Sequence, residues 1–413
     1  MSSDLETLLH RVAPEEAGPA PVGDIVRRAR RRRLRLGVTA AGIAVIGMVG
    51  GQQAMSAFDR SSPDPAAPSP LRIREGARIQ VDGSPVVLAF GEGATWVATD
   101  NGVLHRIDPS SNDVVASVQL LENTIQSGRL IDENGADAGP APQRPPQRFA
   151  TISTGQGAVW VSASSAARGC RIFKVDPDTN EVAAEASVPG CSPMTAAAGA
   201  LWVGVAADDG SPGKLLALDP ASLEIGREVK TGPCCMSGIA ETGGYLWLGR
   251  QDISNTPQDP AAEHEDMVLD MALDVLQIDP SSLSVINEVP LDGDTYHPGD
   301  TLLSEAIAPD AQGVWLTRPE AGVLVHVDTA RLVVDKNVEV HQLRMPDNPV
   351  VGEEWIAVSD LNGTSIALID RQSGEVVDVY DTNSLLAGDA GTNGNSLWVA
   401  QPDKNRVVRL EVE

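Results

Sequence analysis

Residues 93–108 read GATWVATDNGVLHRID, and variants of this stretch recur along the whole chain. Its first half is a short phrase in which a glycine precedes a tryptophan within an apolar run. Tryptophan occurs seven times in the chain, always in a version of this phrase, at Trp96, Trp160, Trp202, Trp247, Trp315, Trp355 and Trp398. A chain whose tryptophans all share one local context consists of copies of one structural unit.

The second half of the stretch is an apolar run that ends in Asp and a turn. The aspartates of this second phrase are Asp108, Asp176, Asp219, Asp279, Asp328 and Asp370, and Pro follows the first four. An Asp side chain accepts backbone N–H groups within a turn, and Pro presets the first central φ angle. Each of these sites is therefore predicted to join two strands of a hairpin.

The length of the unit indicates the architecture. Short β-rich segments give about four strands per unit, and consecutive tryptophans lie 42, 45, 40 and 43 residues apart in four cases. The two longer spacings, 64 and 68, equal one unit plus an insertion, within 121–149 and 251–270. This period predicts an all-β, seven-bladed β-propeller over residues 72–413, with the tryptophans as structural core residues of the blades.

The ends of the repeat region predict how the ring closes. The last unit stops at Val407–Leu410, which matches the third strand of a blade, and the segment 73–81 (IREGARIQV) precedes the first unit as an unassigned strand. We expect this strand to complete blade seven, which leaves the ring without an open sheet edge.

The N-terminal part of the chain has a different composition. Residues 1–36 carry eight Arg and five acidic residues, and an uncharged stretch then extends from Leu36 to Phe58. This pattern predicts a cytoplasmic basic segment (1–36), one transmembrane helix (37–58), a Pro/Ser linker (59–71) and an extracytoplasmic propeller, in a single-pass cell-membrane protein. The alternative is an export signal cleaved near the small residues at 54–57.

Charge restricts the partners of the outer part. The whole chain has a net charge of −26, and because residues 1–36 contribute +3, the remainder carries −29. Repulsion from phosphate groups therefore argues against nucleic acid as a partner.

All four cysteines, Cys170, Cys191, Cys234 and Cys235, lie within the repeat region, as expected for an oxidising compartment. Cys170 opens the third strand of blade two and Cys191 follows the fourth, so the two are disulfide candidates across one hairpin. That pairing leaves Cys234 and Cys235 as a vicinal pair. A bridge between Cys191 and Cys235 across two blades is the competing interpretation.

Few residues indicate chemistry. The sequence contains no nucleophile elbow or phosphate loop, and the acidic run 263–266 lacks the spacing of a metal site, so we assign no catalytic residue, metal or cofactor. Arginine stands three residues after the tryptophan only in blades four and five, at Arg250 and Arg318. These two arginines form our candidate ligand-binding pair, for an anion near the channel mouth; the alternative is that each forms ion pairs with acidic neighbours.

The repeat phrases over residues 72–413 resemble those of seven-bladed propellers related to streptogramin lyases and to periplasmic proteins of similar repeat. Membership would imply a metal-dependent lyase. The lyases typically read Trp-Phe-Thr-Glu, whereas this chain ends the phrase in Thr99, Arg250 or Gln401, and no His follows His341. Counted from each tryptophan, no copy has an acidic residue at this position, so no catalytic residue is carried over.

The first 58 residues resemble actinobacterial single-span membrane proteins, some of which are anti-sigma regulators. The similarity lies in the Leu5–Leu9 segment, the arginine cluster and the apolar stretch, without a zinc-ligand motif. Together these features predict a membrane-anchored binding module for a protein, peptide, glycan or small ligand, with a possible cytoplasmic regulator on residues 1–36. The alternative function is a metal-dependent lyase or hydrolase.

Overall fold

The computed structural model describes residues 71–121, 129–131, 137–140, 148–165, 169–206, 212–232, 235–252, 269–296, 307–319, 321–360, 363–384 and 390–413. They belong to one compact unit, Pro68–Glu413. The predicted cytoplasmic segment and membrane span lie outside the described residues. Within the described ranges, no helix combines the length and apolar character that a membrane crossing requires.

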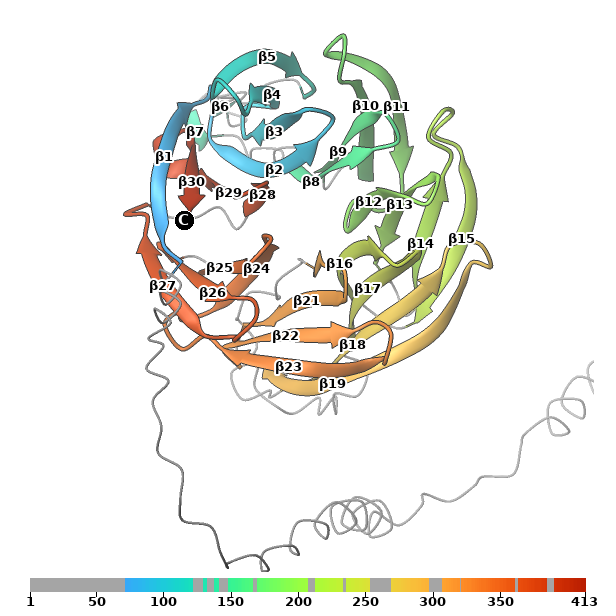
Figure 1. Ribbon diagram of the computed structural model, residues 1–413. Coiled ribbons are helices and arrows are strands. Elements are labelled where there is room, and N and C mark those ends of the chain that lie inside the picture. The colour runs from blue at the N-terminus through green and yellow to red at the C-terminus, as the bar shows by residue number, and fades with distance from the viewer. Residues whose placement is uncertain are drawn as a thin grey trace, which may run out of the picture. The chain divides into compact units, whose positions relative to one another are not determined.

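Seven antiparallel sheets of four strands each are arranged radially around a central axis (Figure 1). The first strands of neighbouring blades contact one another around the inside of the ring, and the fourth strands lie at the outside. This arrangement confirms the prediction of an all-β, seven-bladed propeller with four strands per blade.

The strands of blades one to three, from the innermost outward, are β2 (Pro85–Gly91), β3 (Ala94–Thr99), β4 (Val103–Asp108) and β5 (Asp113–Gln119); β8 (Arg148–Gly155), β9 (Ala158–Ser165), β10 (Gly169–Asp176) and β11 (Glu181–Val188); and β12 (Met194–Ala197), β13 (Ala200–Val205), β14 (Gly213–Leu218) and β15 (Ile225–Gly232). Those of blades four and five are β16 (Cys235–Thr242), β17 (Tyr245–Asp252), β18 (Leu269–Asp279) and β19 (Ser284–Tyr296); and β20 (Ile307–Pro309), β21 (Gly313–Arg318), β22 (Val323–Asp328) and β23 (Val333–Glu339). Those of blades six and seven are β24 (Pro346–Val351), β25 (Trp355–Asp360), β26 (Ser365–Asp370) and β27 (Val376–Asp381); and β28 (Ala390–Asn393), β29 (Ser396–Gln401), β30 (Arg406–Val412) and β1 (Ile73–Gln80). The remaining elements are the paired strands β6 (Arg129–Ile131) and β7 (Asp137–Pro140) and the 3-10 turn η1 (Pro402–Lys404).

The ring closes through β1, the strand that precedes blade one in the sequence. It pairs antiparallel with β30, from Ile73 opposite Val412 to Gln80 opposite Arg406. Both ends of the propeller therefore share blade seven, and backbone hydrogen bonds rather than loops hold the ring closed.

The repeated aspartates hold the turns between the third and fourth strands. In blade one, Asp108 Oδ1 accepts the backbone N–H of Ser110 at 2.7 Å, and its carbonyl accepts the N–H of Asn112 at 2.8 Å. Asn112 lies in the left-handed region at φ 62°, which Asn tolerates well. The same turn recurs in blades two to six, and hydrogen bonds from side chains and backbone N–H groups of the turn to the carboxylate lower the pKa of each repeated Asp.

All seven tryptophans lie on the second strand of their blades and are at most 2% exposed. In blade one, Trp96 pairs with Arg106 of the third strand, and in blade five Trp315 pairs with His326. Blade six differs, because Trp355 pairs with Asp370 itself, two residues further along. Its tryptophan has moved by two residues, which keeps the side chain on the same face of the sheet.

A disulfide joins Cys170 and Cys191, with their Cα atoms 5.4 Å apart. It connects the start of β10 to the segment after β11, within blade two. This result confirms the hairpin pairing and excludes a bridge between Cys191 and Cys235. Cys234 and the side chain of Cys235 lie outside the described residues, so the vicinal pair stays a prediction.

Candidate functional site

The candidate site residues lie at the seams, where two neighbouring blades pack together. At several seams, a cationic side chain of one blade donates hydrogen bonds to the Asp turn of the next blade, and we call this contact a latch. In blade one, Arg106 lies with its guanidinium carbon 5.5 Å from the ring centre of Trp96. Its Nη1 donates to the carbonyl of Pro177 at 2.6 Å and to Asn180 Oδ1 at 3.2 Å, in the Asp turn of blade two. Arg409 of blade seven makes the same bonds to Pro109 and Asn112 of blade one. In both cases, an arginine that lies over the tryptophan of its own blade is hydrogen-bonded to the Asp turn of the next blade.

Leucine replaces asparagine in the turns of blades three, four and five. Leu223, Leu283 and Leu332 occupy the left-handed position, with φ of 60°, 58° and 56°. This conformation is uncommon for a bulky side chain. Each of these leucines packs into the hydrophobic cluster that it shares with the preceding blade. The turns of blades three, four and five therefore contribute apolar packing to their seams. The turns of blades one and two instead contribute the amide of an Asn, which accepts a hydrogen bond from an arginine.

Arg250, at the end of the second strand of blade four, forms two ion pairs. Its Nη2 lies 2.6 Å from Asp274 Oδ2 and 2.6 Å from Glu288 Oε1, and its Nη1 donates to the carbonyl of Thr231 in blade three. Burial alone would lower the pKa of Arg250, but the hydrogen bond that it donates to Asp274 and the two carboxylate charges raise this pKa above its ordinary value. The guanidinium is therefore held at the seam between blades three and four.

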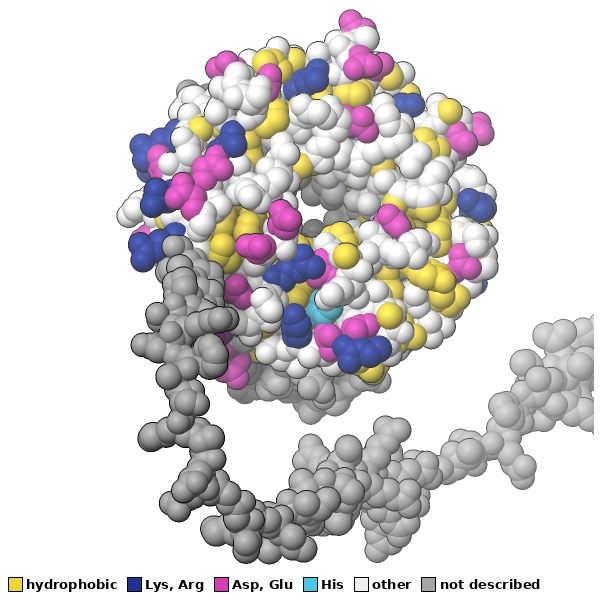
Figure 2. All heavy atoms as spheres, in the orientation of Figure 1, with side chains coloured by type: hydrophobic (Ala, Val, Ile, Leu, Met, Phe, Trp, Pro, Cys, Tyr) yellow, Lys and Arg dark blue, Asp and Glu magenta, His cyan; other side chains and the backbone are white. Residues whose placement is uncertain are grey.

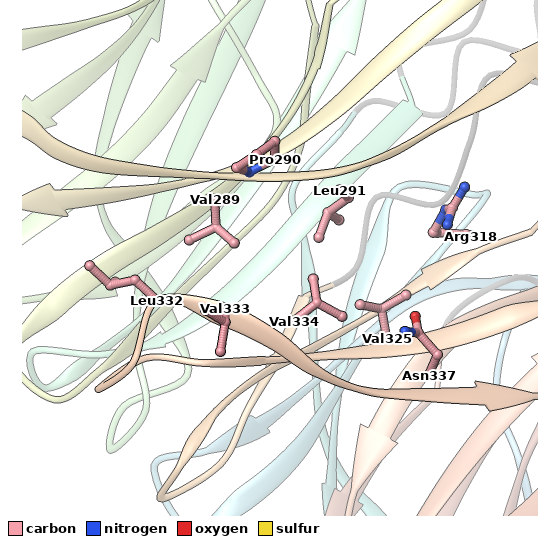
Figure 3. A pocket seen from close by; sticks show the side chains of 9 residues that line it. All are labelled: Val289, Pro290, Leu291, Arg318, Val325, Leu332, Val333, Val334 and Asn337. Carbon is pink, nitrogen blue, oxygen red and sulfur yellow. The ribbon is translucent and has the colours of Figure 1, made fainter. Parts of the chain in front are cut away.

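Arg318 occupies the matching register in blade five, but it faces a different seam. It lines a cavity of about 320 Å³ between β19 of blade four and β21–β23 of blade five. Figure 3 shows Arg318 and Asn337 at one end of this cavity, with Val289 and Leu332 toward the other. The structure thus places the two arginines at two successive seams, and whether either binds a ligand stays a prediction.

Strand pairing changes the comparison of this position in blade six. Counting from Trp355, the residue that corresponds to Arg250 and Arg318 is Val358. However, Ala357 pairs with Leu368 as Trp315 pairs with His326, so Asp360 is the structural equivalent. Counting from the tryptophan gives no acidic residue at this position in any copy, whereas strand pairing places an acidic residue there in blade six. Asp360 accepts the backbone N–H of Met345 at 2.9 Å, which gives it a structural contact.

The seam between blades five and six contains a buried cluster of charges that the sequence did not reveal. Asp310 Oδ2 accepts the indole N–H of Trp315 at 2.8 Å and lies 3.2 Å from Arg371 Nη2. His326 is 2% exposed and lies between two carboxylates, with Nδ1 2.6 Å from Asp335 Oδ1 and Nε2 3.6 Å from Asp310 Oδ1. The only sequence signal was a His opposite a core tryptophan, on a strand that otherwise looks fully apolar.

Electrostatics within this cluster favour its charged state. Burial would raise the pKa of Asp310, but His326, Trp315 and the backbone N–H groups of Gln312 and Gly313 hold it well below its usual range. Burial would likewise lower the pKa of His326, but Asp310 and Asp335 raise it. Because His326 is enclosed, we interpret the cluster as structural.

The site residues do not form a metal centre within the described parts of the chain, which contain no group of three or more His, Cys, Asp or Glu arranged to hold an ion. The acidic run 263–266 lies outside those parts. In Figure 2, acidic and basic side chains are spread around one face of the ring, which has a hollow at its centre.

Comparison with solved structures identifies similar folds at low sequence identity. The β-propeller domain of Cps50 (Swd1) from Myceliophteria thermophila is 10% identical, with a TM-score of 0.56, covering 83% of this chain and 100% of that one. BamB from Moraxella catarrhalis is 13% identical, with a TM-score of 0.49, covering 82% of this chain and 98% of that one. No protein-family model and no curated protein matches the sequence. The class defined by these findings is the β-propeller.

Proposed function

We propose that this chain is a single-pass membrane protein that displays its propeller outside the cell as a binding module for a protein or small ligand. The observation that carries this proposal is the order of features along the chain. Eight arginines are followed by an uncharged stretch, a Pro/Ser-rich segment and a propeller with a disulfide. A basic flank favours the cytoplasmic side of a span, and disulfides persist in oxidising compartments.

Binding rather than catalysis is supported by the state of the polar groups. The buried carboxylates of Asp274 and Asp310 are already engaged by Arg250, His326 and Arg371. A general base needs access to its substrate, and these groups are occupied by structural partners. The cavity beside Arg318 instead is lined by both aliphatic and polar side chains and offers a place for a ligand.

Protease accessibility tests the membrane topology. The full-length protein carries one epitope tag at each end, and intact cells, stripped of any outer wall barrier, are treated with a protease that does not cross the membrane. We expect loss of the C-terminal tag and protection of the N-terminal tag, with both lost after permeabilisation. Protection of both tags, or release of the whole propeller in soluble form, would contradict an anchored outer domain.

Crosslinking in the native membrane tests the binding role. We expect the propeller to capture a specific extracytoplasmic partner, and a partner on residues 1–36 would indicate that the protein also transmits a signal inward. Deletion of residues 1–30 is the matched control, because it removes only the inner contact. Turnover of a cyclic depsipeptide lactone that a chelator abolishes would instead favour the lyase alternative.

A further inference from the structure

Blade one contains a histidine where the other six blades carry an apolar residue. His105, on β4, pairs with Val97, the residue that follows the tryptophan on β3. In the other blades, the residue at this position of the third strand is Phe173, Leu216, Leu276, Val325, Ala367 or Val408. His105 is only 3% exposed, so its ring nitrogens need hydrogen-bond partners inside the protein.

Two contacts fix the protonation of this ring. His105 Nε2 lies 2.9 Å from the backbone carbonyl oxygen of Asp82 and 3.4 Å from Thr99 Oγ1. Since a carbonyl oxygen only accepts hydrogen bonds, Nε2 carries the proton of the neutral ring. Asp82 lies between β1 and β2, in the connection from blade seven to blade one, so this connection orients the imidazole. The lone pair of Nδ1 is therefore left as an acceptor.

The acceptor nitrogen faces a serine on the outer strand of the blade. Ser117 pairs directly with His105, and its hydroxyl donates to His105 Nδ1 at 2.8 Å. Ser117 is exposed on β5, at the outside of blade one (Figure 1), whereas the histidine is buried on the neighbouring strand. The groups form a series of an accessible nucleophile, a base within hydrogen-bond reach and an acceptor that orients the base.

This geometry favours reaction at the serine oxygen. A serine hydroxyl is a weak nucleophile unless a base removes its proton as the new bond forms. Here the proton passes along an existing hydrogen bond to His105 Nδ1, and the imidazolium that forms keeps its Nε2–H bond to the carbonyl of Asp82. The buried base does not have to contact the acyl donor, because only the exposed serine does.

We propose that Ser117 is an activated serine, an acylation site for esters with a good leaving group, and that His105 is its general base. Ser117 Oγ attacks the carbonyl carbon of the ester, and its proton moves to His105 Nδ1. The bond from that carbon to the leaving oxygen then breaks, and the leaving group departs with the electron pair as an oxyanion. The product on the protein is an ester of Ser117. This inference goes beyond the proposed binding function and does not depend on it.

The test is labelling of the purified full-length chain, in lipid nanodiscs, with an alkyl fluorophosphonate, which phosphonylates activated serines with loss of fluoride. We expect a single labelled site, located at Ser117 by mass spectrometry of the peptides, and competition by p-nitrophenyl acetate. Ser111, an exposed serine of the same blade, is the internal reference, because its Oγ accepts the N–H of Asp113 instead of bonding to an imidazole. Equal labelling of Ser111 and Ser117, or no label at Ser117, would overturn the proposal.

Variants separate the roles of the two residues. Ser117→Ala should abolish labelling, whereas Ser111→Ala, the matched control, should leave it unchanged. His105→Phe installs the residue type that blade two carries at this position, and it should slow labelling by about a hundredfold, a usual contribution of a general base. His105→Gln should cause a similar loss. An unchanged rate in either histidine variant, with the circular dichroism of the native protein, would refute the role of His105.

Denaturation gives a readout that needs no variant. In urea the pairing of β4 with β5 is lost, and with it the hydrogen bond from Ser117 to the imidazole. Labelling of Ser117 should therefore disappear with the folded structure and return on refolding. Labelling that persists in the unfolded chain would show that it does not depend on His105, and it would contradict the proposal.

Discussion

The two seams of blade five differ in chemistry although the same repeat builds both. Toward blade four, Val289 and Leu291 face Val325 across a cavity that ends at Arg318. Toward blade six, Asp310 and His326 form a buried cluster of charges. The repeat therefore specifies where blades meet, but the residues at each seam decide whether the contact is closed by charges or left open.

This difference separates a seam that is closed by buried charges from a seam that contains free volume. Removing one partner of a buried charge cluster leaves the others uncompensated, so such a seam tolerates little change. An aliphatic seam with free volume tolerates changes in side-chain size and admits small molecules. We therefore expect mutations to cost more stability at the seam between blades five and six than at the seam between blades four and five.

The largest effect is expected from Asp310→Ala. This change removes the acceptor of the Trp315 indole and of two backbone N–H groups, and it leaves His326 and Arg371 without a carboxylate that they now contact. The free energy of unfolding should fall by about 3–5 kcal/mol, as measured by urea denaturation. Val334→Ala at the other seam is the control and should cost less. A similar loss in both variants would remove the distinction between the seams.

Transplanting a latch should have a smaller effect. Leu332→Asn alone loses apolar packing and should lower the free energy of unfolding by about 1–3 kcal/mol. Combined with Gln277→Arg, it recreates the Arg–Asn contact that Arg106 and Asn180 make between blades one and two. The double mutant should recover about 1 kcal/mol relative to the sum of the single changes. Purely additive effects would show that the latch requires other features of that seam.

A pH-dependent effect above neutrality is expected at the charged seam. His326 faces Asp310 and Asp335, and Arg371 and Arg331 contact these two carboxylates in turn. The pKa of His326 is raised in the folded protein, so its stabilising contribution is complete below the ordinary His value of about 6.5 and is lost as pH rises through the folded pKa. The stability difference between the native protein and His326→Gln should therefore shrink as pH increases above neutrality. A difference that grows with pH would contradict a raised pKa.

The smallest effect is expected from Val325→Ile, which adds one methylene toward the cavity. Because free volume is present there, the change should be neutral or raise the free energy of unfolding by about 0.5–1 kcal/mol. Thermal unfolding provides the measurement. A loss of stability would indicate that the seam is closed around Val325.

Local sequence signals were sufficient for much of the fold. The tryptophan phrase and the Asp turn recur often enough to give the blade number, and the pattern around Cys170 and Cys191 included the observed disulfide among its alternatives. The alignment of equivalent residues between blades was harder to predict from the sequence. Trp355 stands two residues out of register, and because a shift of two keeps a side chain on the same face, hydrophobic alternation alone does not detect it. Strand pairing was needed to align Asp360 with Arg318.

The candidate site was only partly predictable for a similar reason. Arg250 and Arg318 share a register, which the sequence showed, and each lies at the seam with the preceding blade, but the groups that surround them at the two seams differ. The cavity at Arg318 and the cluster around His326 combine residues from different strands and blades. Contacts of this kind are invisible to a comparison of repeats.

By itself, the sequence determined the periodic features of this protein: seven blades, turns held by aspartate and a strand that closes the ring. These follow from local hydrogen bonding and from alternation along each strand, which are properties of neighbouring residues. Only the tertiary structure decided which seam is charged and which contains a cavity. The physical reason is that seam packing depends on side chains from two blades at once, and the free energy of each contact is set by the partner that the fold brings opposite.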